Sequence, residues 1–203
     1  MKEICIFGAG GHTRSLISLL NNCGFKIAGI YDDSFNSEAV EFINSIEIVG
    51  SLSSYNLIKP VVLSFGNNDK RKKLFRKYYK NLCHKTICHP TSFIDETVDF
   101  GESNFVFANA VINSNAKIGN NNIINTGSII EHEVIIGSNN HIAVGSIICG
   151  RSIIGNDCFL GAGCVIIDKI NICDGVTIGA GAIVVKSIYE PGTYVGVPAK
   201  KIK

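Results

Sequence analysis

One histidine in the second half of the chain stands between two carboxylates, in the segment Glu131-His132-Glu133. A neutral imidazole titrates near physiological pH and is therefore suited to take a proton from an attacking nucleophile. A neighbouring carboxylate can fix the tautomer of such a ring and stabilise the imidazolium that forms. Glu133 is the first choice for this carboxylate and Glu131 the second, because adjacency in sequence does not prove a hydrogen bond. An exposed turn histidine would fit the same position.

A second group of side chains invites a metal interpretation. Cys83, His84, Cys88 and His89 form a Cys-His pair that is repeated after five residues. A zinc site needs four ligands that converge on one point, yet no C-x-x-C spacing is present and Pro90 follows at once. We therefore interpret these cysteines as buried or half-buried thiols at a domain junction, and we expect no metal.

Composition limits the class of protein further. The chain has 203 residues, of which 46% are hydrophobic and 18% charged, and its net charge is +2. This balance favours packed cores over disorder, and it does not favour a dedicated nucleic-acid or membrane-surface binder. Apolar runs of 18 residues are missing from the sequence, and the N-terminus resembles a first strand more than a signal peptide. We expect a cytoplasmic protein.

The strongest signal is a six-residue period in the second half of the chain. Steps of six from Ile94 to Val184 meet an apolar residue at sixteen consecutive positions. The residue two places earlier is mostly small, as at Ala110, Ala116, Ser128, Ser146, Ser152, Cys158, Cys164 and Ala182. A period of six fits neither a helix nor a plain alternating strand. It fits a short strand plus a tight turn, three of which close one triangular coil, so we predict about five stacked coils with aliphatic ladders inside.

The first half follows a different pattern. An apolar run at residues 4–7 leads into Gly8, Gly10 and Gly11, then a helical apolar face, then a second strand at 27–31 that ends in Asp32 and Asp33. A glycine turn before a helix offers backbone N–H groups and a positive dipole end to phosphates. An acidic residue at the tip of the second strand can accept a hydrogen bond from a ribose hydroxyl.

The dinucleotide fingerprint is incomplete, because G-x-G-x-x-G needs glycine where Thr13 stands. We therefore predict a half-size Rossmann-like unit for a mononucleotide and not for NAD. A third strand at residues 61–65 leads into Gly66, Asn67 and a basic stretch, which is most often a solvated helix face. Within that stretch Arg71 lies near the strand tip, within reach of a phosphate.

These patterns together resemble a known family over nearly the whole chain. The motifs that carry the resemblance are G-A-G-G-H-x-R, D-D, F-G-N-N-x-x-R-K-K, the hexapeptide repeat and the ending GTYVGVPAKKIK. They are similar to the hexapeptide-repeat sugar acetyltransferases of the bacillosamine-pathway and sialic-acid O-acetyltransferase type. The resemblance implies an α/β Rossmann-like half domain that binds a nucleotide sugar, residues 1–85, followed by an all-β left-handed parallel β-helix, residues 86–203. The handedness comes from the resemblance alone.

The better-matched branch of that family implies an activity. It is acetyl-CoA-dependent N-acetylation of the 4-amino group of a UDP- or dTDP-linked 4-amino-4,6-dideoxy sugar, in bacterial lipopolysaccharide or O-antigen biosynthesis. The amine attacks the thioester directly, with a histidine as general base. Two alternatives stay open: O-acetylation of a sialic-acid-like sugar, and a non-enzymatic scaffold that binds nucleotide sugars.

The resemblance also assigns residues to three groups. Catalysis would involve His132 as base, Glu133 or Glu131, Asn125, and Gly150 as an oxyanion donor. The acetyl-CoA arm would lie along His141, Gly150, Gly179, Gly181, Pro198 and Ala199. The nucleotide would be lined by Gly10, Gly11, His12, Asp32, Asp33, Gly66 and Asn67, with Arg71 added from its position, although His12 could instead cap the helix start.

A single coil has no concave pocket, and a groove forms where two prisms meet. We therefore expect a homotrimer with three active sites at the subunit interfaces.

Overall fold

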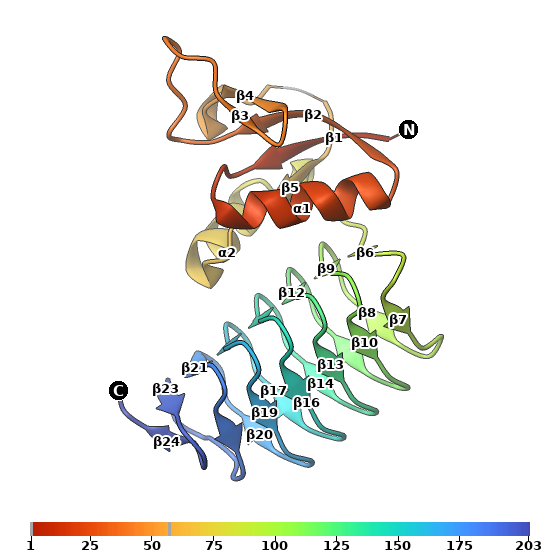
Figure 1. The fold of residues 1–203 in the computed structure, drawn as a ribbon, viewed down its shortest axis with the longest axis vertical. Coiled ribbons are helices and arrows are strands. Elements are labelled where there is room, and N and C mark those ends of the chain that lie inside the picture. The colour runs from red at the N-terminus through yellow and green to blue at the C-terminus, as the bar shows by residue number, and fades with distance from the viewer. Residues whose placement is uncertain (1, 57) are drawn as a thin grey trace. The chain divides into compact units, whose positions relative to one another are not determined.

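The computed structural model describes residues 2–56 and 58–203, which divide into two compact units between Ile87 and Cys88 (Figure 1). Each unit has its own sheet system and core. Neither helix of the described residues has the length and hydrophobicity needed to span a membrane.

The first unit is a small parallel α/β sheet. Its elements are β1 (Lys2–Phe7), α1 (Gly11–Asn22), β2 (Phe25–Tyr31), β3 (Phe42–Ile43), β4 (Ile46–Gly50), the 3-10 turn η1 (Leu52–Ser54), β5 (Val61–Leu63), α2 (Asn68–Lys77) and the 3-10 turn η2 (Tyr79–Asn81). The strand order is β3-β4-β2-β1-β5. All neighbours are parallel except β3 and β4, which form an antiparallel hairpin. This hairpin was not predicted from the sequence, and its turn residues Asn44 and Ser45 both have positive φ.

Thr13 explains the incomplete glycine fingerprint. Its side chain is fully buried, its hydroxyl donates to the Gly8 carbonyl oxygen at 2.8 Å, and it accepts from the Ser64 hydroxyl at 3.0 Å. Gly8 itself has φ +110°, and a Cβ there would lie 2.9 Å from the Ser64 carbonyl oxygen. The hydroxyl of Thr13 therefore links the loops that follow β1 and β5 by hydrogen bonds. A glycine at position 13 would allow close packing there but could not make these bonds.

The second unit is a triangular parallel β-helix built almost entirely from two-residue strands (Figure 1). One face carries β7 (Phe93–Ile94), β10 (Val111–Ile112), β13 (Ile129–Ile130), β16 (Ile147–Ile148), β19 (Val165–Ile166) and β22 (Ile183–Val184). The second carries β8 (Asp99–Phe100), β11 (Lys117–Ile118), β14 (Ile135–Ile136), β17 (Ile153–Ile154) and β20 (Asn171–Ile172). The third carries β6 (Ile87–Cys88), β9 (Phe105–Val106), β12 (Ile123–Ile124), β15 (His141–Ile142), β18 (Phe159–Leu160), β21 (Val176–Ile178), β23 (Gly192–Val195) and β24 (Lys200–Lys201).

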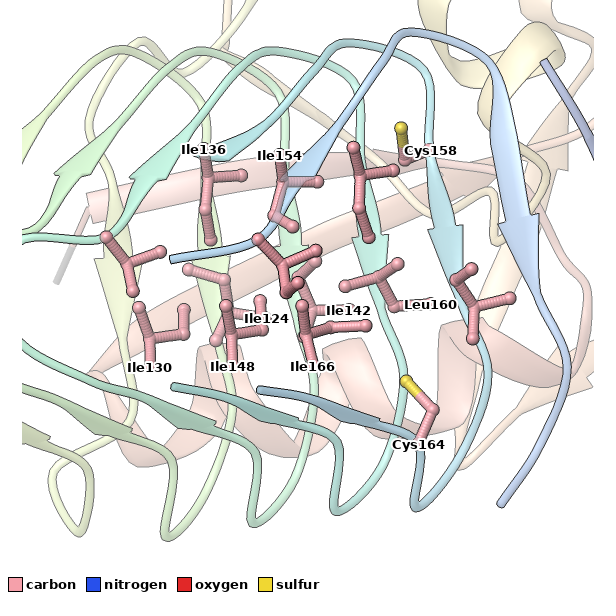
Figure 2. Packing of buried hydrophobic residues seen from close by; sticks show 14 of the residues in the cluster. Ile124, Ile130, Ile136, Ile142, Ile148, Ile154, Cys158, Leu160, Cys164 and Ile166 are labelled. Atoms are coloured by element: carbon pink, nitrogen blue, oxygen red, sulfur yellow. The ribbon is translucent and has the colours of Figure 1, made fainter. Parts of the chain in front are cut away.

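Strands pair in parallel with the residue 18 positions further on, as Ile112 does with Ile130 and Ile130 with Ile148. In the two-residue strands from β9 to β22 the second residue points inward, so that the isoleucines stack in ladders along the axis (Figure 2). The predicted period and the coil of three hexapeptides are thereby confirmed.

The small position before the core residue departs from expectation on the third face. Asn104, Asn122 and Asn140 occupy it and are fully buried. The Oδ1 atoms of Asn104 and Asn122 accept from the backbone N–H groups of Asn122 and Asn140 at 2.9 and 2.8 Å, and Asn140 Oδ1 accepts from Cys158 N at 2.7 Å. A buried amide is tolerated here because the next coil supplies a backbone donor to it. The repeat thus carries a polar ladder beside its aliphatic ones.

Candidate active site

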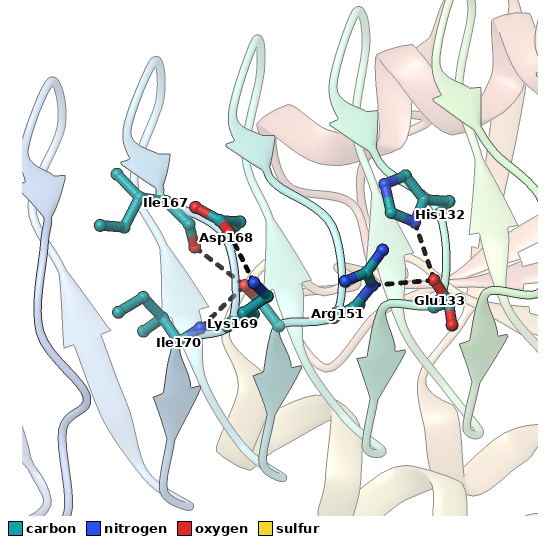
Figure 3. Close-up of polar contacts among 8 residues, drawn as sticks. His132, Glu133, Arg151, Ile167, Asp168, Lys169 and Ile170 are labelled. Carbon is teal, nitrogen blue, oxygen red and sulfur yellow. Dashed lines mark hydrogen bonds and ion pairs between the residues drawn. The ribbon is translucent and has the colours of Figure 1, made fainter.

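His132 lies on the turn that joins β13 to β14, at one corner of the prism. Its Nδ1 lies 3.0 Å from Glu133 Oε2, and the side chain is 44% exposed (Figure 3). Because an ionised carboxylate only accepts hydrogen bonds, this contact makes Nδ1 the protonated nitrogen of the neutral ring and leaves Nε2 as the acceptor. The geometry selects Glu133 as the carboxylate at the ring. Glu131 contributes its backbone N–H to Ile148 O at 2.9 Å, in the ladder between coils.

Glu133 is held in its ionised form by two neighbours. The Arg151 guanidinium, whose Nε donates to Glu133 Oε2 at 3.0 Å, lowers the pKa of that carboxyl, and His132 lowers it further. Because the carboxylate stays charged well below neutral pH, it is available to stabilise an imidazolium at His132.

Gly150 gives the imidazole its space. It stands one coil beyond His132, and a Cβ added to it would lie 2.6 Å from His132 Nε2 and 2.7 Å from Cε1. Any side chain at position 150 would displace the ring. Glycine leaves room for the imidazole, which lies against the backbone of the next coil. The role of the Gly150 N–H as an oxyanion donor stays a prediction.

Asn125 and His141 form a second polar pair at another corner. Asn125 Nδ2 lies 3.3 Å from His141 Nε2, and the imidazole of His141 packs edge-on against Phe159, with centroids 5.2 Å apart. Asn125 follows β12 and precedes β13, whereas His132 follows β13, so a whole strand of one face separates the two groups within the chain. The single chain therefore does not bring together all the residues that were predicted to act as one site.

The predicted acetyl-CoA residues near the C-terminus fall in two places. Gly179 lies against β23, where an added Cβ would meet Val195 Cγ1 at 2.7 Å, and Gly181 has φ +66° at a corner. Pro198 and Ala199 line a cavity of about 260 Å³, together with Val184, Val185, Lys186, Ser187, Ile188, Tyr194 and Lys200. The cavity is apolar inside and has lysines among its lining residues, but the geometry by itself assigns no ligand to it.

A larger cavity, about 490 Å³, opens at the carboxyl ends of β1, β2 and β5 in the first unit. Its lining is Ala9, Gly10, Gly11, His12, Asp32, Ser34, Ser64, Phe65, Gly66, Asn67 and Lys70. This edge is where parallel α/β sheets bind ligands. Helix α1 begins after Gly10 and α2 after Asn67, so two positive helix ends face a ligand here.

Asp32 braces the glycine loop from the tip of β2. Its Oδ2 accepts from Ala9 N at 2.8 Å, and its Oδ1 accepts from Ser34 N at 2.9 Å and from the Ser34 hydroxyl at 2.6 Å. Burial opposes ionisation of this carboxyl, but the hydrogen bonds from Ser34 and Ala9 outweigh it, and its pKa lies below the ordinary value. Asp33, its predicted companion, is exposed and lies outside the described lining.

The basic residue of this cavity is Lys70, where the sequence analysis expected Arg71. Arg71 is fully buried, and its guanidinium donates to Phe65 O at 2.9 Å and to Asn68 Oδ1 at 2.8 Å. Arg71 therefore stabilises the loop between β5 and α2 from inside the first unit. Lys70 lines the cavity, with Nζ 4.5 Å from the centroid of the Phe65 ring. Asn67 could have indicated this choice from the sequence, because asparagine is a favoured helix cap. Its Oδ1 accepts from Lys70 N at 2.8 Å, and this cap sets which residue of the first turn faces the ligand.

The titratable cluster at the end of the first unit shows no metal geometry. Cys83 and Cys88 are thiols of intermediate exposure outside any disulfide, and burial raises the pKa of Cys83. Within residues 2–56 and 58–203, no group of three or more His, Cys, Asp and Glu side chains is arranged to hold a metal ion.

Comparisons with known proteins match both units. Residues 3–78 match the family described as the PglD N-terminal domain. A histidine-to-alanine variant of GDP-perosamine N-acetyltransferase from Caulobacter crescentus, solved with CoA and GDP-perosamine, is 28% identical with TM-score 0.90 over 100% of this chain and 98% of that one. The acetyltransferase domain of PglB from Neisseria gonorrhoeae FA1090 is 24% identical with TM-score 0.92 over the full length of both chains. That domain was also solved with acetyl coenzyme A, at TM-score 0.91 and 24% identity over 99% of each chain. A search of curated proteins gave no match.

The fold is therefore that of the left-handed β-helix acyltransferases, and the chain is an enzyme of that class. Residues 3–78 resemble the PglD N-terminal domain, and the full-length architecture is similar to that of the sugar N-acetyltransferases of the bacillosamine and perosamine type.

Proposed function

We propose that this chain transfers the acetyl group of acetyl-CoA to the 4-amino group of a UDP- or dTDP-linked 4-amino-4,6-dideoxy sugar, in the cytoplasm, for a bacterial surface glycan such as lipopolysaccharide. One observation carries the proposal: an imidazole whose Nδ1 is held by Glu133 and whose Nε2 faces the backbone of Gly150. The Caulobacter relative, crystallised with CoA and a GDP-linked amino sugar, supports the same class of acceptor.

The reaction would use the chain's own groups in a defined order. The sugar amine attacks the thioester carbon as His132 Nε2 takes a proton from nitrogen, and Glu133 stabilises the imidazolium. The Gly150 N–H would donate to the oxyanion of the tetrahedral intermediate. The C–N bond remains, the C–S bond breaks, and the imidazolium returns its proton to the CoA sulfur. The neutral base is thereby regenerated.

The first unit would hold the nucleotide. Two helix N-termini and Lys70 supply positive charge for a diphosphate at one wall of the cavity, which includes Gly11, His12 and Asn67. Asp32 stands at the tip of β2, where an acidic residue accepts from a ribose hydroxyl. In this account residues 1–85 bind the nucleotide sugar and residues 86–203 carry out the transfer.

A homotrimer would complete the active site. The outer column on the six-stranded face of the β-helix is apolar throughout and at least partly exposed, and consists of Phe93, Val111, Ile129, Ile147, Val165 and Ile183. Exposed apolar strips of this extent mark association surfaces. This face lies between the corner of His132 and the corner of Asn125 and His141. A ring of three chains joins unlike surfaces, so it can set the His132 corner of one chain against the Asn125 corner of the next.

Thiol release from acetyl-CoA tests the function. The acceptors are UDP-, dTDP- and GDP-linked 4-amino-4,6-dideoxyhexoses, with CMP-sialic acid and free sialic acid alongside. We expect rapid release with one amino sugar and its loss in His132→Ala. Turnover with sialic acid only would move the assignment to O-acetylation. Silence with every acceptor, in a protein that binds the nucleotide sugars, would favour a binding scaffold.

A further inference from the structure

Arg151 completes a chain of contacts behind the imidazole (Figure 3). Glu133 Oε2 lies 3.0 Å from His132 Nδ1 and 3.0 Å from Arg151 Nε, so a single oxygen meets both donors. Arg151 was not predicted from the sequence. A search of the sequence for opposite charges 18 residues apart would have identified it, because equivalent residues of successive coils stack about 4.8 Å apart.

We infer that Arg151 is a positioning residue, which holds the Glu133 carboxylate at Nδ1 and so keeps Nε2 of His132 unprotonated for the acceptor amine. The inference rests on the proposed function of His132 as base. Arg151 touches neither the thioester nor the amine in this account, and it acts only through Glu133.

The backbone places this pair in register. Asn115, Glu133, Arg151 and Lys169 occupy the same corner position in four successive coils, with φ of +58°, +59°, +59° and +58°. The other two corners repeat this left-handed conformation, for example at Gly127 and at Asn121. The conformation is therefore a feature of the coil, and it sets Glu133 and Arg151 at equivalent points of successive coils.

The exposure of the pair argues against a purely structural role. The side chains of Glu133 and Arg151 are 51% and 54% exposed. Exposed ion pairs contribute little to stability, since solvent screens them. The planar guanidinium is nevertheless a good orienting group, because its N–H donors are fixed in direction. What the contact provides is a defined place for the carboxylate, which would otherwise turn toward water.

The next coil offers a matched control. Lys169 holds the same corner position as Arg151, and its Nζ lies 3.8 Å from Asp168 Oδ2, its own sequence neighbour. Its backbone N–H donates to Gly150 O at 3.0 Å, as that of Arg151 donates to His132 O at 3.0 Å. Lys169→Gln therefore removes a cation from the same corner without touching the Glu133 carboxylate.

The test combines kinetics with nitrogen NMR of isotope-labelled histidine in the full-length protein. For the neutral ring of His132 we expect the wild type to show the Nδ1–H tautomer, and Arg151→Gln to shift the ring toward Nε2–H. We expect kcat to fall about fivefold in Arg151→Gln with KM unchanged, the size set by an exposed ion pair. Arg151→Lys should recover most of this loss, and Lys169→Gln should leave kcat and the tautomer as in wild type.

A double-mutant cycle gives the sharpest reading. If Arg151 acts through Glu133, the double variant Glu133→Gln, Arg151→Gln should be no slower than Glu133→Gln alone. Additive losses would overturn the inference, as would an unchanged tautomer in Arg151→Gln. A raised KM for acetyl-CoA at constant kcat would also overturn it, because Arg151 would then contact a substrate. Undiminished transfer in His132→Ala would refute the base itself, and the NMR spectra keep that failure separate from this one.

Discussion

Gly150→Ala is the most informative single change at the proposed active site. The new Cβ would stand 2.6 Å from His132 Nε2, and ordinary contact begins near 3.4 Å, so the ring must move by about 0.8 Å. Rotation of His132 also strains its contact with Glu133, now at 3.0 Å. A misplacement of about 1 Å in a reacting group costs on the order of a hundredfold in rate. We therefore expect kcat to fall between roughly tenfold and a hundredfold, by that scaling.

The assay is thiol release from acetyl-CoA at saturating nucleotide sugar. KM for the nucleotide sugar should change little, because the cavity that we assign to the nucleotide lies in the first unit. Ser114→Ala is the matched control, since Ser114 precedes His132 by one coil in the same column and lends only its carbonyl oxygen, to Glu133 N at 2.9 Å. Wild-type kcat in Gly150→Ala, with an unchanged melting temperature, would refute the placement of the imidazole against this backbone.

Three further predictions test the rest of the account. Lys70→Met should raise KM for the nucleotide sugar about tenfold at constant kcat, the value of one charge-assisted hydrogen bond, and titration calorimetry with the free nucleotide diphosphate should show the same loss. Asn122→Ala should lower the free energy of unfolding by about 1–3 kcal/mol in urea titrations, because it strands the Asn140 N–H in the core. Asp32 has a lowered pKa, so its hydrogen bonds to Ala9 and Ser34 stabilise the fold above the unfolded pKa of about 4 and lose that effect as pH falls through the lower folded value. Asp32→Asn should therefore flatten the acid limb of the pH–stability curve, and an unaltered limb would contradict this assignment.

The repeat made the second unit predictable from sequence. Sixteen apolar positions at a fixed period of six are compatible with few architectures. A closed coil of three hexapeptides is one of them, because each of its three sides buries one residue in six. The strand, glycine turn and helix of the first unit were predictable for a similar reason, since each depends on local pattern. The short β3–β4 hairpin was not predicted, because β3 has only two residues and carries no periodicity.

The side-chain contacts within the candidate sites could not be predicted, because they depend on which residues of successive coils lie side by side or on the register of a helix. The choice between Lys70 and Arg71 followed from the cap at Asn67, which sets the first turn of α2. Arg151 reaches Glu133 only because corners stack at 18 residues. In the sequence alone, the asparagines of the ladder are polar residues at core positions. The pairing of successive coils then shows which backbone N–H groups donate to their side chains. Local pattern predicts elements well, and long-range register decides which side chains meet.

The most direct test of the central claim compares wild type with His132→Ala in acetyl transfer to a nucleotide-linked 4-amino-4,6-dideoxy sugar, with the product identified by mass spectrometry. General-base catalysis contributes about 10²–10⁴-fold, so kcat/KM should fall by that factor while the nucleotide sugar still binds. An N-acetylated product formed by His132→Ala at the wild-type rate would contradict the account.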